Sequence, residues 1–336
     1  MQWEGENEPG LHLHLLPAKG WTNHARSWSF AQHVEVALQQ EKYDVVIGFN
    51  KMPHLDVYFA ADVCYQARVT KDKLGWYRLL PRYQIYTKLE SAVFAHGNKT
   101  EIMLISPQQQ SEYTRVYQTE PSRFHLLPPG ISRDRIAPSN ANDIREEIRH
   151  HYSIPNDHFI LLMVGSGFKT KGVNRSILAL ADMRDTLKQR CHLWIIGEDN
   201  PKTFLKLARQ KHIDDQVKFF GGRHDVPELL IAADLLLHPA YHENTGTVLL
   251  EAMLAGLPVL TTDVCGYAHY VQEAQAGKVL TSPFLQEKFN IEVENMLTSP
   301  EREQWQQNGL AFAKHEEIFQ LVSVATNLIE QIGKQK

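Results

Sequence analysis

Two glutamates stand eight residues apart at the start of an apolar helical pattern, with a glycine between them. Glu243 precedes the pattern, and Glu251 lies about two turns into it, since an α-helix has 3.6 residues per turn. The backbone amides of Gly246 and Thr247 fall at the predicted helix N-terminus, where unpaired N–H groups and the helix dipole favour an anion. A carboxylate accepts hydrogen bonds from sugar or ribose hydroxyls. The spacing predicts a diphosphate site flanked by two carboxylates, although either glutamate taken alone is more often an exposed surface residue.

A strand–helix–strand unit must position these groups. Residues 235–237 are an apolar run that suits a buried strand, and proline at position 239 ends it. Asn244 and Thr245 are good helix N-cap residues, 248–254 continues as an apolar helix, and 259–262 reads as the next strand. In a parallel unit of this kind, the helix N-terminus lies beside the carboxyl end of the first strand, where α/β proteins bind ligands.

A glycine-containing loop with two lysines follows the predicted buried strand 159–164. It contains Gly165, Lys169 and Lys171, and a helix is expected from residue 173. Its spacing fits neither the Walker loop nor G-x-G-x-x-G, yet the order strand, glycine loop, lysine, helix is typical of phosphate binding. Lys171 could neutralise a departing diphosphate; the alternative is a lysine that faces solvent.

Polar residues also follow two predicted strands in the first third of the chain. Asn50 and Lys51 come after the strand at 44–48, and Asp62 comes after the strand at 57–61. Loops at the carboxyl ends of strands gather ligand-binding groups. We therefore expect a second site here; a capping aspartate and a surface lysine are the alternative.

Residues 66–96 combine six lysines and arginines with five aromatic residues and two acidic ones. Proline at position 81 is predicted to divide this segment into two helical pieces. Such a segment suits an anionic membrane surface, with aromatic rings at the interface and cations on the headgroups. A solvated helix with aromatic core contacts is the alternative, and no nucleic-acid-binding motif accompanies the charge. The residues expected to face the membrane are Arg78, Arg82, Tyr83 and Lys88.

Composition limits the protein class. The chain has 336 residues and a formal net charge of −4, which gives no global signal for nucleic-acid binding. Its three cysteines are isolated, so neither a disulfide framework nor a zinc site is expected, and reduced thiols fit the cytosol. We predict no metal cofactor, because no Asp-x-Asp motif stands in a strand–loop context. Neither a signal peptide nor an 18-residue apolar run is present.

The length suits two α/β domains. We place a first domain over 1–135, a second domain with alternating strands and helices over 143–312, and a terminal helix over 313–336. Residues 11–16 alternate and could form a half-buried strand, 23–40 reads as a helix, and 300–331 is helical and amphipathic.

The motif Glu243-x7-Glu251, followed by Ala-x-x-Ala-Gly-x-Pro-Val, resembles the signature of the retaining GT-B glycosyltransferases of family 4. The resemblance implies two Rossmann-like, doubly wound domains that face each other across a cleft, with the acceptor side in 1–135 and the nucleotide-sugar donor side in 143–312. It also implies that the terminal helix 313–336 returns towards the first domain. It assigns Glu243 to the donor sugar, the Gly246 and Thr247 amides to the phosphates, and Glu251 to the ribose. The remaining donor-binding residues that it implies are Gly165, Lys169, Lys171, Arg223, Asn244 and Val248. Thr170 departs from the family pattern, which has a basic residue there.

A narrower resemblance covers nearly the whole chain and points to the branch that adds glucose to the heptose of the lipopolysaccharide inner core. It rests on residues 48–53, 55–65, 127–131 and 264–270. It implies UDP-glucose as donor, a lipid A-core acceptor that Asp62 faces, and a place on the cytoplasmic face of the inner membrane. The glycine loop that opens the first domain in this family is not found, so the first domain is expected to be incomplete. The alternatives are a non-catalytic homologue that keeps UDP or membrane binding and a GT-B nucleotide-sugar epimerase.

Overall fold

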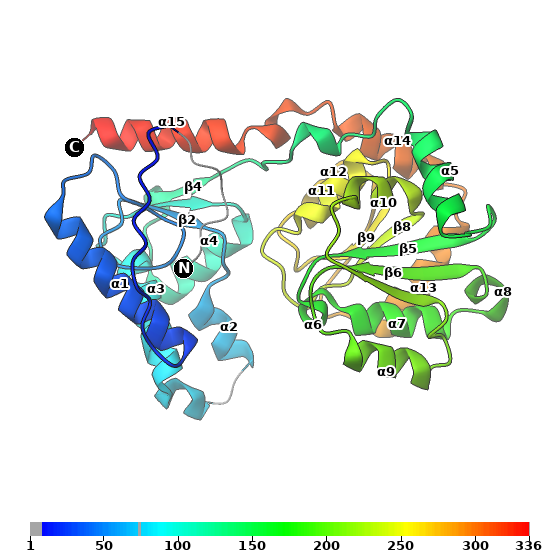
Figure 1. The fold of residues 1–336 in the computed structure, drawn as a ribbon, viewed down its shortest axis with the longest axis horizontal. Coiled ribbons are helices and arrows are strands. Elements are labelled where there is room, and N and C mark those ends of the chain that lie inside the picture. The colour runs from blue at the N-terminus through cyan, green and yellow to red at the C-terminus, as the bar shows by residue number, and fades with distance from the viewer. Residues whose placement is uncertain (1–8, 73–74, 336) are drawn as a thin grey trace. The chain divides into compact units, whose positions relative to one another are not determined.

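The protein is described by a computed structural model that covers residues 9–72 and 75–335. The chain divides into two compact units (Figure 1). Unit 1 comprises Met1–Leu127 and Val322–Lys336, and unit 2 comprises Pro128–Leu321. The first division falls between Leu127 and Pro128, whereas the sequence analysis placed the end of the first domain at residue 135.

Unit 2 is built on a six-stranded parallel sheet of order β10-β9-β8-β5-β6-β7. The central strands are almost entirely apolar and buried, as expected of a sheet that helices cover on both faces. This confirms the predicted doubly wound arrangement. The strands are β5 (Phe159–Val164), β6 (Cys191–Ile196), β7 (Val217–Gly221), β8 (Leu235–His238), β9 (Val259–Thr262) and β10 (Gly277–Leu280).

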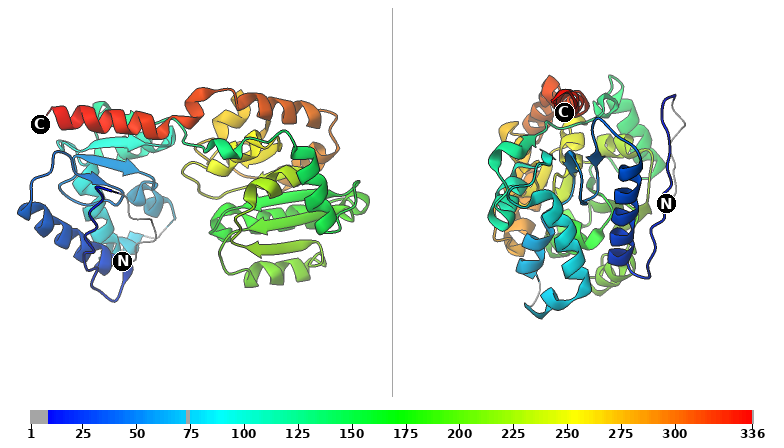
Figure 2. Two further views of the ribbon diagram at one scale, coloured as in Figure 1. Left: turned by 45° about the horizontal axis from the view of Figure 1, so that its top comes forward. Right: turned by 90° about the vertical axis from the view of Figure 1, so that its left-hand side faces the viewer.

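Helices pack on both faces of this sheet and form two apolar cores (Figures 1 and 2). One face carries α5 (Ala141–His151), α10 (Val226–Ala232), α11 (Thr247–Leu254) and α12 (Ala268–Glu273). The other carries α7 (Val173–Asp182), α8 (Asp185–Lys188), α9 (Lys202–Gln210) and α13 (Gln286–Thr298). The remaining helical elements are α6 (Phe168–Lys171), α14 (Arg302–Phe312) and two 3₁₀ turns, η3 (Arg133–Arg135) and η4 (Glu316–Phe319).

Unit 1 has a four-stranded parallel sheet of order β1-β2-β3-β4. Its core lies between the sheet and its helices, around fully buried Tyr58, Phe94 and Tyr113. The strands are β1 (Ile47–Gly48), β2 (Val57–Ala60), β3 (Glu101–Leu104) and β4 (Phe124–Leu126). The helical elements are α1 (Asn23–Gln40), α2 (Tyr65–Asp72), η1 (Gly75–Leu79), α3 (Pro81–Phe94), α4 (Pro107–Tyr117), η2 (Pro121–Arg123) and most of α15 (Leu321–Lys334).

Two of these elements confirm the helix predictions. The predicted helix 23–40 is α1, and Pro81 begins α3 and so divides the basic segment as expected. Proline suits this first helical position, because the N–H that it lacks would have no partner there.

Three local predictions were wrong. Residues 11–16 form no strand, because their alternating leucines find no sheet partner, and Leu15 remains 65% exposed. The strand expected over 44–48 shortens to β1, since the Asp56 carboxylate, rather than a strand, accepts the Val46 amide hydrogen. The N-cap of α11 is Gly246 in the left-handed conformation, not Asn244 or Thr245.

Candidate active site

Buried contacts hold the loop after β8 in place. The Arg175 guanidinium donates to the carbonyl oxygens of Pro239 and Ala240 at 3.0 and 2.9 Å, and the Thr262 hydroxyl donates to Ala240 at 3.1 Å. The guanidinium also lies 3.6 Å from the centroid of the Tyr241 ring, a cation–π contact. The loop therefore starts from a fixed backbone position at the carboxyl end of a central strand.

This loop brings Glu243 against two cations, Lys171 and His238. Lys171 Nζ donates to Oε2 of Glu243, and Nε2 of His238 lies 3.2 Å from the same oxygen. His238 is 1% exposed at the end of β8, whereas Lys171 comes from the glycine loop after β5. Two predicted site residues that are 72 positions apart in sequence therefore meet here. His238 had no predicted role.

Ionisation follows from these contacts. Burial alone would raise the pKa of Glu243, but the hydrogen bonds and charges of His238 and Lys171 lower it to about 2. Burial alone would lower the pKa of His238, but hydrogen bonds with Cys265 and Glu243 raise it to about 9. At neutral pH the three side chains therefore carry two positive charges and one negative charge. The residual positive charge suits a diphosphate.

Gly246 shapes the start of α11. Its φ is +79°, and an added Cβ would lie 3.3 Å from the Leu249 side chain and 3.4 Å from Glu243. A side chain would therefore be strained and crowded at this position. No side chain of a described residue caps the helix here, so the amides of Thr247 and Val248 can donate to an anion. Val248 itself is buried and contributes only its backbone.

Glu251 lies in the middle of α11 and is about one-fifth exposed. Burial raises its pKa, and the Arg135 guanidinium, 3.8 Å away, partly offsets this effect. Arg135 belongs to η3, which had no predicted role. The carboxylate is therefore partly shielded from water and has one distant cation as its partner.

The glycine loop after β5 packs against the β8 loop. Gly172 has φ +79°, and a Cβ there would collide with the Pro239 carbonyl oxygen. A Cβ on Gly165 would lie 3.2 Å from Cε of Lys171. Small residues thus let the two loops approach and aim Lys171 at Glu243. Lys169, the other predicted cation of this loop, is exposed, and no described residue pairs with it.

The position of Arg223 is set by a neighbour in sequence. Its Nε donates to Oδ1 of Asp225 at 2.7 Å, and its Nη2 donates to Oδ2 of the same carboxylate. The guanidinium lies 5.8 Å from the centroid of the Phe220 ring. No hydrogen bond or ion pair joins Arg223 to Lys171 or Glu243 among the described residues. The Asn244 backbone amide, in contrast, donates to Oε1 of Glu243 at 3.1 Å, so this predicted donor-binding residue lies directly at the cluster.

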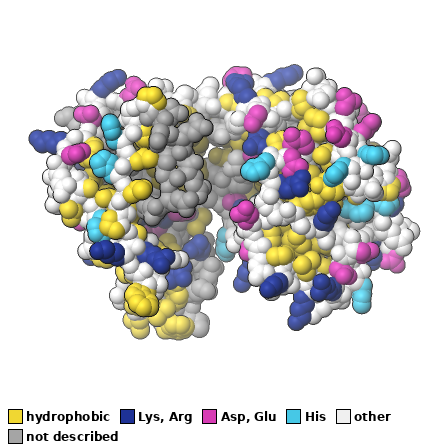
Figure 3. Space-filling view, in the orientation of Figure 1, with side chains coloured by type: hydrophobic (Ala, Val, Ile, Leu, Met, Phe, Trp, Pro, Cys, Tyr) yellow, Lys and Arg dark blue, Asp and Glu magenta, His cyan; other side chains and the backbone are white. Residues whose placement is uncertain are grey.

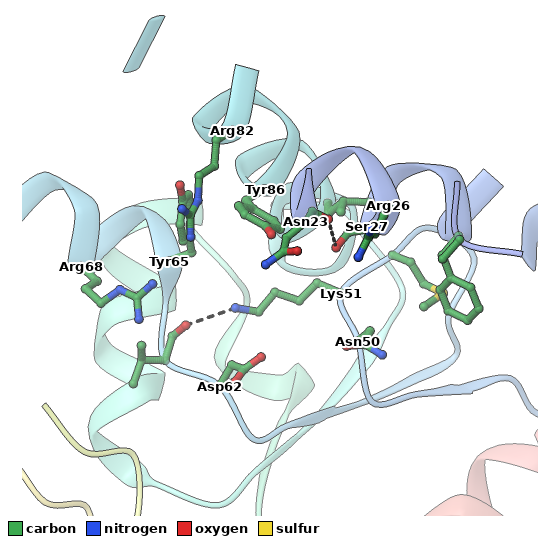
Figure 4. A pocket seen from close by; sticks show the side chains of 15 residues that line it. Asn23, Arg26, Ser27, Asn50, Lys51, Asp62, Tyr65, Arg68, Arg82 and Tyr86 are labelled. Carbon is green, nitrogen blue, oxygen red and sulfur yellow. Dashed lines mark hydrogen bonds between the residues drawn. The ribbon is translucent and has the colours of Figure 1, made fainter. Parts of the chain in front are cut away.

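Unit 1 contains a separate pocket of about 550 Å³ that includes all three predicted acceptor-side residues, Asn50, Lys51 and Asp62 (Figure 4). Asn50 and Asp62 are exposed at its rim. Lys51 is only 12% exposed and donates to Oε1 of Glu90 at 2.6 Å and to the Val63 carbonyl oxygen at 3.1 Å. Lys51 is thus committed to an internal ion pair.

Glu90 is a buried residue that sequence reasoning missed. Its fully buried carboxylate accepts hydrogen bonds from the amides of Tyr65 and Gln66 at 2.8 and 3.0 Å and from the Tyr117 hydroxyl at 2.7 Å. It therefore ties α2, α3 and α4 together behind the pocket. The sequence offered one signal of this burial, which is a single carboxylate within the apolar run of α3.

The residues expected to face a membrane differ in their surroundings. Arg78 and Lys88 are exposed, and Lys88 Nζ lies 4.3 Å from the Trp28 ring centroid. Arg82 lines the pocket of unit 1, and the Tyr83 ring packs against Tyr65 and Tyr77 instead of pointing outward.

Large apolar side chains share the turn η1 with Arg78. Trp76 is 60% and Leu79 77% exposed in η1, and Figure 3 shows hydrophobic side chains with basic ones beside them in this part of unit 1. Within residues 9–72 and 75–335, no helix is long and apolar enough to cross a membrane, and no cluster of three metal-ligating side chains occurs.

Comparisons with known proteins identify close relatives. The family model of the glycosyl transferases group 1 matches residues 144–312. The lipopolysaccharide glucosyltransferase WaaG of Escherichia coli K12 is 45% identical over 328 residues, which cover 97% of this chain and 88% of that protein. The D-inositol 3-phosphate glycosyltransferase of Streptomyces scabiei is 29% identical over 181 residues, covering 51% of this chain and 40% of its own length.

Solved structures agree with these relatives. The crystal structure of WaaG, a glycosyltransferase involved in lipopolysaccharide biosynthesis, superimposes with a TM-score of 0.92 at 44% identity and covers 97% of this chain and 89% of that one. Anabaena Alr3699/HepE in complex with UDP-glucose has a TM-score of 0.68 at 19% identity and covers 93% and 77% of the two chains, a likeness of fold.

Proposed function

The chain belongs to the group 1 glycosyltransferases and has the GT-B fold, and from this membership we propose that it transfers glucose from UDP-glucose to a heptose hydroxyl of the lipopolysaccharide inner core. The anomeric configuration of the glucose is retained in the proposed reaction. Unit 2 binds the donor and unit 1 the acceptor.

The observation that carries this proposal is the extent of the similarity to WaaG. That similarity spans 97% of the chain and so includes unit 1, whereas the inositol-phosphate enzyme matches only 51%. A donor-binding half is common to the family, but the acceptor half differs between branches with different acceptors. Similarity in both halves supports the same acceptor class as that of WaaG.

The Lys171–Glu243–His238 cluster supports the chemistry. In the transfer, the acceptor oxygen bonds to C1 of glucose while the bond from C1 to the phosphate oxygen breaks, and UDP leaves with the bonding electrons. Lys171 and the amides at the start of α11 stabilise the charge that develops on the leaving diphosphate. Glu243 is ionised at neutral pH, because its pKa is near 2. It therefore accepts hydrogen bonds from sugar hydroxyls and does not supply a proton.

The acceptor proton has two routes. In a front-face mechanism it moves to the leaving phosphate oxygen, and no protein base is required. In a double displacement, a carboxylate bonds to C1 of glucose as the bond from C1 to UDP breaks, the acceptor oxygen then displaces that carboxylate, and the acceptor proton passes to a phosphate oxygen of the departed UDP. Asp62 contacts the acceptor in this proposal and Glu251 holds the ribose, so Glu243 is the carboxylate to test for a covalent adduct.

A transfer assay tests the proposal. The purified chain is incubated with UDP-glucose and a core acceptor that ends at the inner-core heptose, and glucose incorporation and UDP release are measured together. Transfer with an α-linked product is expected, with much less transfer from UDP-galactose. UDP binding without turnover would favour the non-catalytic alternative, and conversion of a UDP-sugar without acceptor would favour the epimerase.

Docking on an anionic membrane is the second part of the proposal. Exposed Arg78 shares the short turn η1 with exposed Trp76 and Leu79, which combines a cation with large apolar side chains, as interfacial segments do. Exposed Lys88 lies over the Trp28 ring. Such docking brings the active site to a lipid-linked acceptor on the cytoplasmic face of the inner membrane.

Vesicle flotation tests the docking. The chain is expected to float with phosphatidylcholine vesicles that contain phosphatidylglycerol and to stay behind with phosphatidylcholine alone. Arg78→Glu should weaken flotation, whereas Arg115→Glu on α4, whose wild-type partner is Glu112, is the matched control. Equal flotation of the two variants would exclude this surface.

A further inference from the structure

Three arginines from three helices converge on the pocket of unit 1. Arg26 comes from α1, Arg68 from α2 and Arg82 from α3, and all three are exposed. Figure 4 shows Arg68 and Arg82 on one side of the pocket and Arg26 across from them, with Lys51 between. No described carboxylate forms an ion pair with any of these guanidinium groups. The proposed transfer chemistry in unit 2 leaves all three without a role.

Two of these arginines lie near aromatic rings. The Arg68 guanidinium lies 5.8 Å from the centroid of the Tyr65 ring, and that of Arg82 lies 5.8 Å from the Tyr86 ring, both within reach of a weak cation–π contact. The two rings contact each other edge to face, 5.2 Å apart. A ring leaves the N–H groups of a neighbouring guanidinium unpaired. Arg68 and Arg82 therefore have donors available for a ligand.

Arg26 is anchored differently, since its Nε donates to the Gly20 carbonyl oxygen at 2.9 Å. That bond uses one donor and leaves the terminal nitrogens free. All three arginines thus have N–H donors that no described residue uses, and all three line the same pocket.

The charge of the pocket comes from these arginines. Lys51 is neutralised by Glu90, so it adds little to the field in the pocket. Among the residues that the structure describes, Asp62 is the one carboxylate that lines the pocket. Arg26, Arg68 and Arg82 together exceed it by two positive charges, which favours an anion.

We propose that this pocket binds an anionic substituent, a phosphate or a carboxylate, on a sugar next to the accepting heptose. Its volume of about 550 Å³ admits a sugar of this kind, and a guanidinium group binds such an anion through charge-assisted hydrogen bonds. Arg68 and Arg82 bind the anion, Arg26 approaches from the opposite side, and Asp62 and Asn50 face the hydroxyls. This inference rests on the proposed function, because it takes the acceptor to be the core saccharide.

A comparison of acceptors tests the inference without vesicles. The transfer assay is run with lipid-free core oligosaccharide that is untreated, dephosphorylated or carboxyl-reduced. The variants are Arg68→Gln, Arg82→Gln and the control Arg115→Gln. Loss of one charged hydrogen-bonding partner is expected to raise KM for the untreated acceptor by roughly tenfold or more, and the double variant should lose more than either single one. KM for UDP-glucose should change by less than about twofold, because unit 2 is untouched.

The treated acceptors identify the anion. If phosphate is the ligand, dephosphorylation of the acceptor should raise the wild-type KM to the level of the variants and leave the KM of the variants unchanged. If a carboxylate is the ligand, carboxyl reduction of the acceptor should have these two effects instead. Equal KM values for wild type and variants with the untreated acceptor would overturn the inference, as would a variant defect that persists after both treatments. Absence of transfer by the wild type would instead refute the proposed function. In that case isothermal titration of the chain with the untreated oligosaccharide tests the inference without turnover. The arginine variants should bind the oligosaccharide more weakly than the wild type.

Discussion

The Nε2 atom of His238 lies 3.2 Å from Oε2 of Glu243, at the carboxyl end of a buried central strand. The folded protein holds the histidine proton more tightly than the unfolded chain, since the pKa of His238 is raised from 6.5 to about 9. His238 therefore contributes its full stabilisation of the folded state below pH 6.5, and this contribution is lost as the pH rises towards 9. Glu243 behaves in the opposite way, because its pKa is lowered from 4.5 to about 2. Its contribution to the stability of the folded state is present above pH 4.5 and is lost as the pH falls towards 2.

We accordingly expect the free energy of unfolding to decrease between pH 6.5 and 9, by on the order of 1–3 kcal/mol from this group. Urea denaturation across this range measures the decrease. His238→Gln should be less stable at pH 6.5 and should show a flatter pH dependence. An unchanged slope in this variant would mean that another group titrates.

Glu243→Gln keeps the side-chain shape but removes the charge that pairs with Lys171. We expect kcat to fall about 10²–10³-fold, because the sugar loses a strong hydrogen-bond acceptor near the reacting carbon. UDP affinity should change little, since the carboxylate does not bind the diphosphate. Initial rates and UDP titration separate these two effects. Glu287→Gln, an exposed residue at the start of α13, is the control.

The Lys171–Glu243 pair also makes a non-additive effect testable. Lys171→Gln removes the cation from the leaving diphosphate and should lower kcat by a similar factor. In the double variant with Glu243→Gln, the loss should be smaller than the sum of the two free energies, because the two side chains contact each other. Strict additivity would mean that they act independently.

Glu251→Gln should weaken UDP binding by roughly tenfold or more, because an amide replaces a carboxylate that accepts two ribose hydrogen bonds. Calorimetric titration with UDP measures the change. Burial raises the pKa of Glu251, so the wild type should bind UDP more weakly at about pH 5 than at about pH 8, as the carboxylate takes up a proton. A variant that binds UDP like the wild type would refute the assignment of Glu251 to the ribose.

Glu90→Gln should destabilise unit 1 by about 3–5 kcal/mol, the usual cost of removing one partner from a buried ion pair. The substitution leaves Lys51 without its counter-ion and weakens two amide contacts. Urea denaturation of the full chain, followed by tryptophan fluorescence, measures the loss. Adding Lys51→Met should restore part of it, and a double variant that is less stable than Glu90→Gln would contradict the pairing.

Local pattern was sufficient for much of the fold. The apolar runs of β5 and β8 identify buried parallel strands, and Pro81 marks a helix boundary that the structure keeps. The alternation of apolar and polar residues in 11–16 led to a wrong strand prediction. Such alternation indicates which face of a strand could be buried, but not whether a neighbouring strand exists to pair with it.

The sequence by itself determined that Glu243, Gly246 and Glu251 share one helix entrance, because spacing along a helix fixes their relative positions. It also carried the family resemblance that the relatives confirm. Only the tertiary structure brought Lys171 and His238 to Glu243, Glu90 to Lys51, and three arginines to one pocket. These residues come from different elements, and packing of the elements, not spacing along the chain, decides which side chains meet.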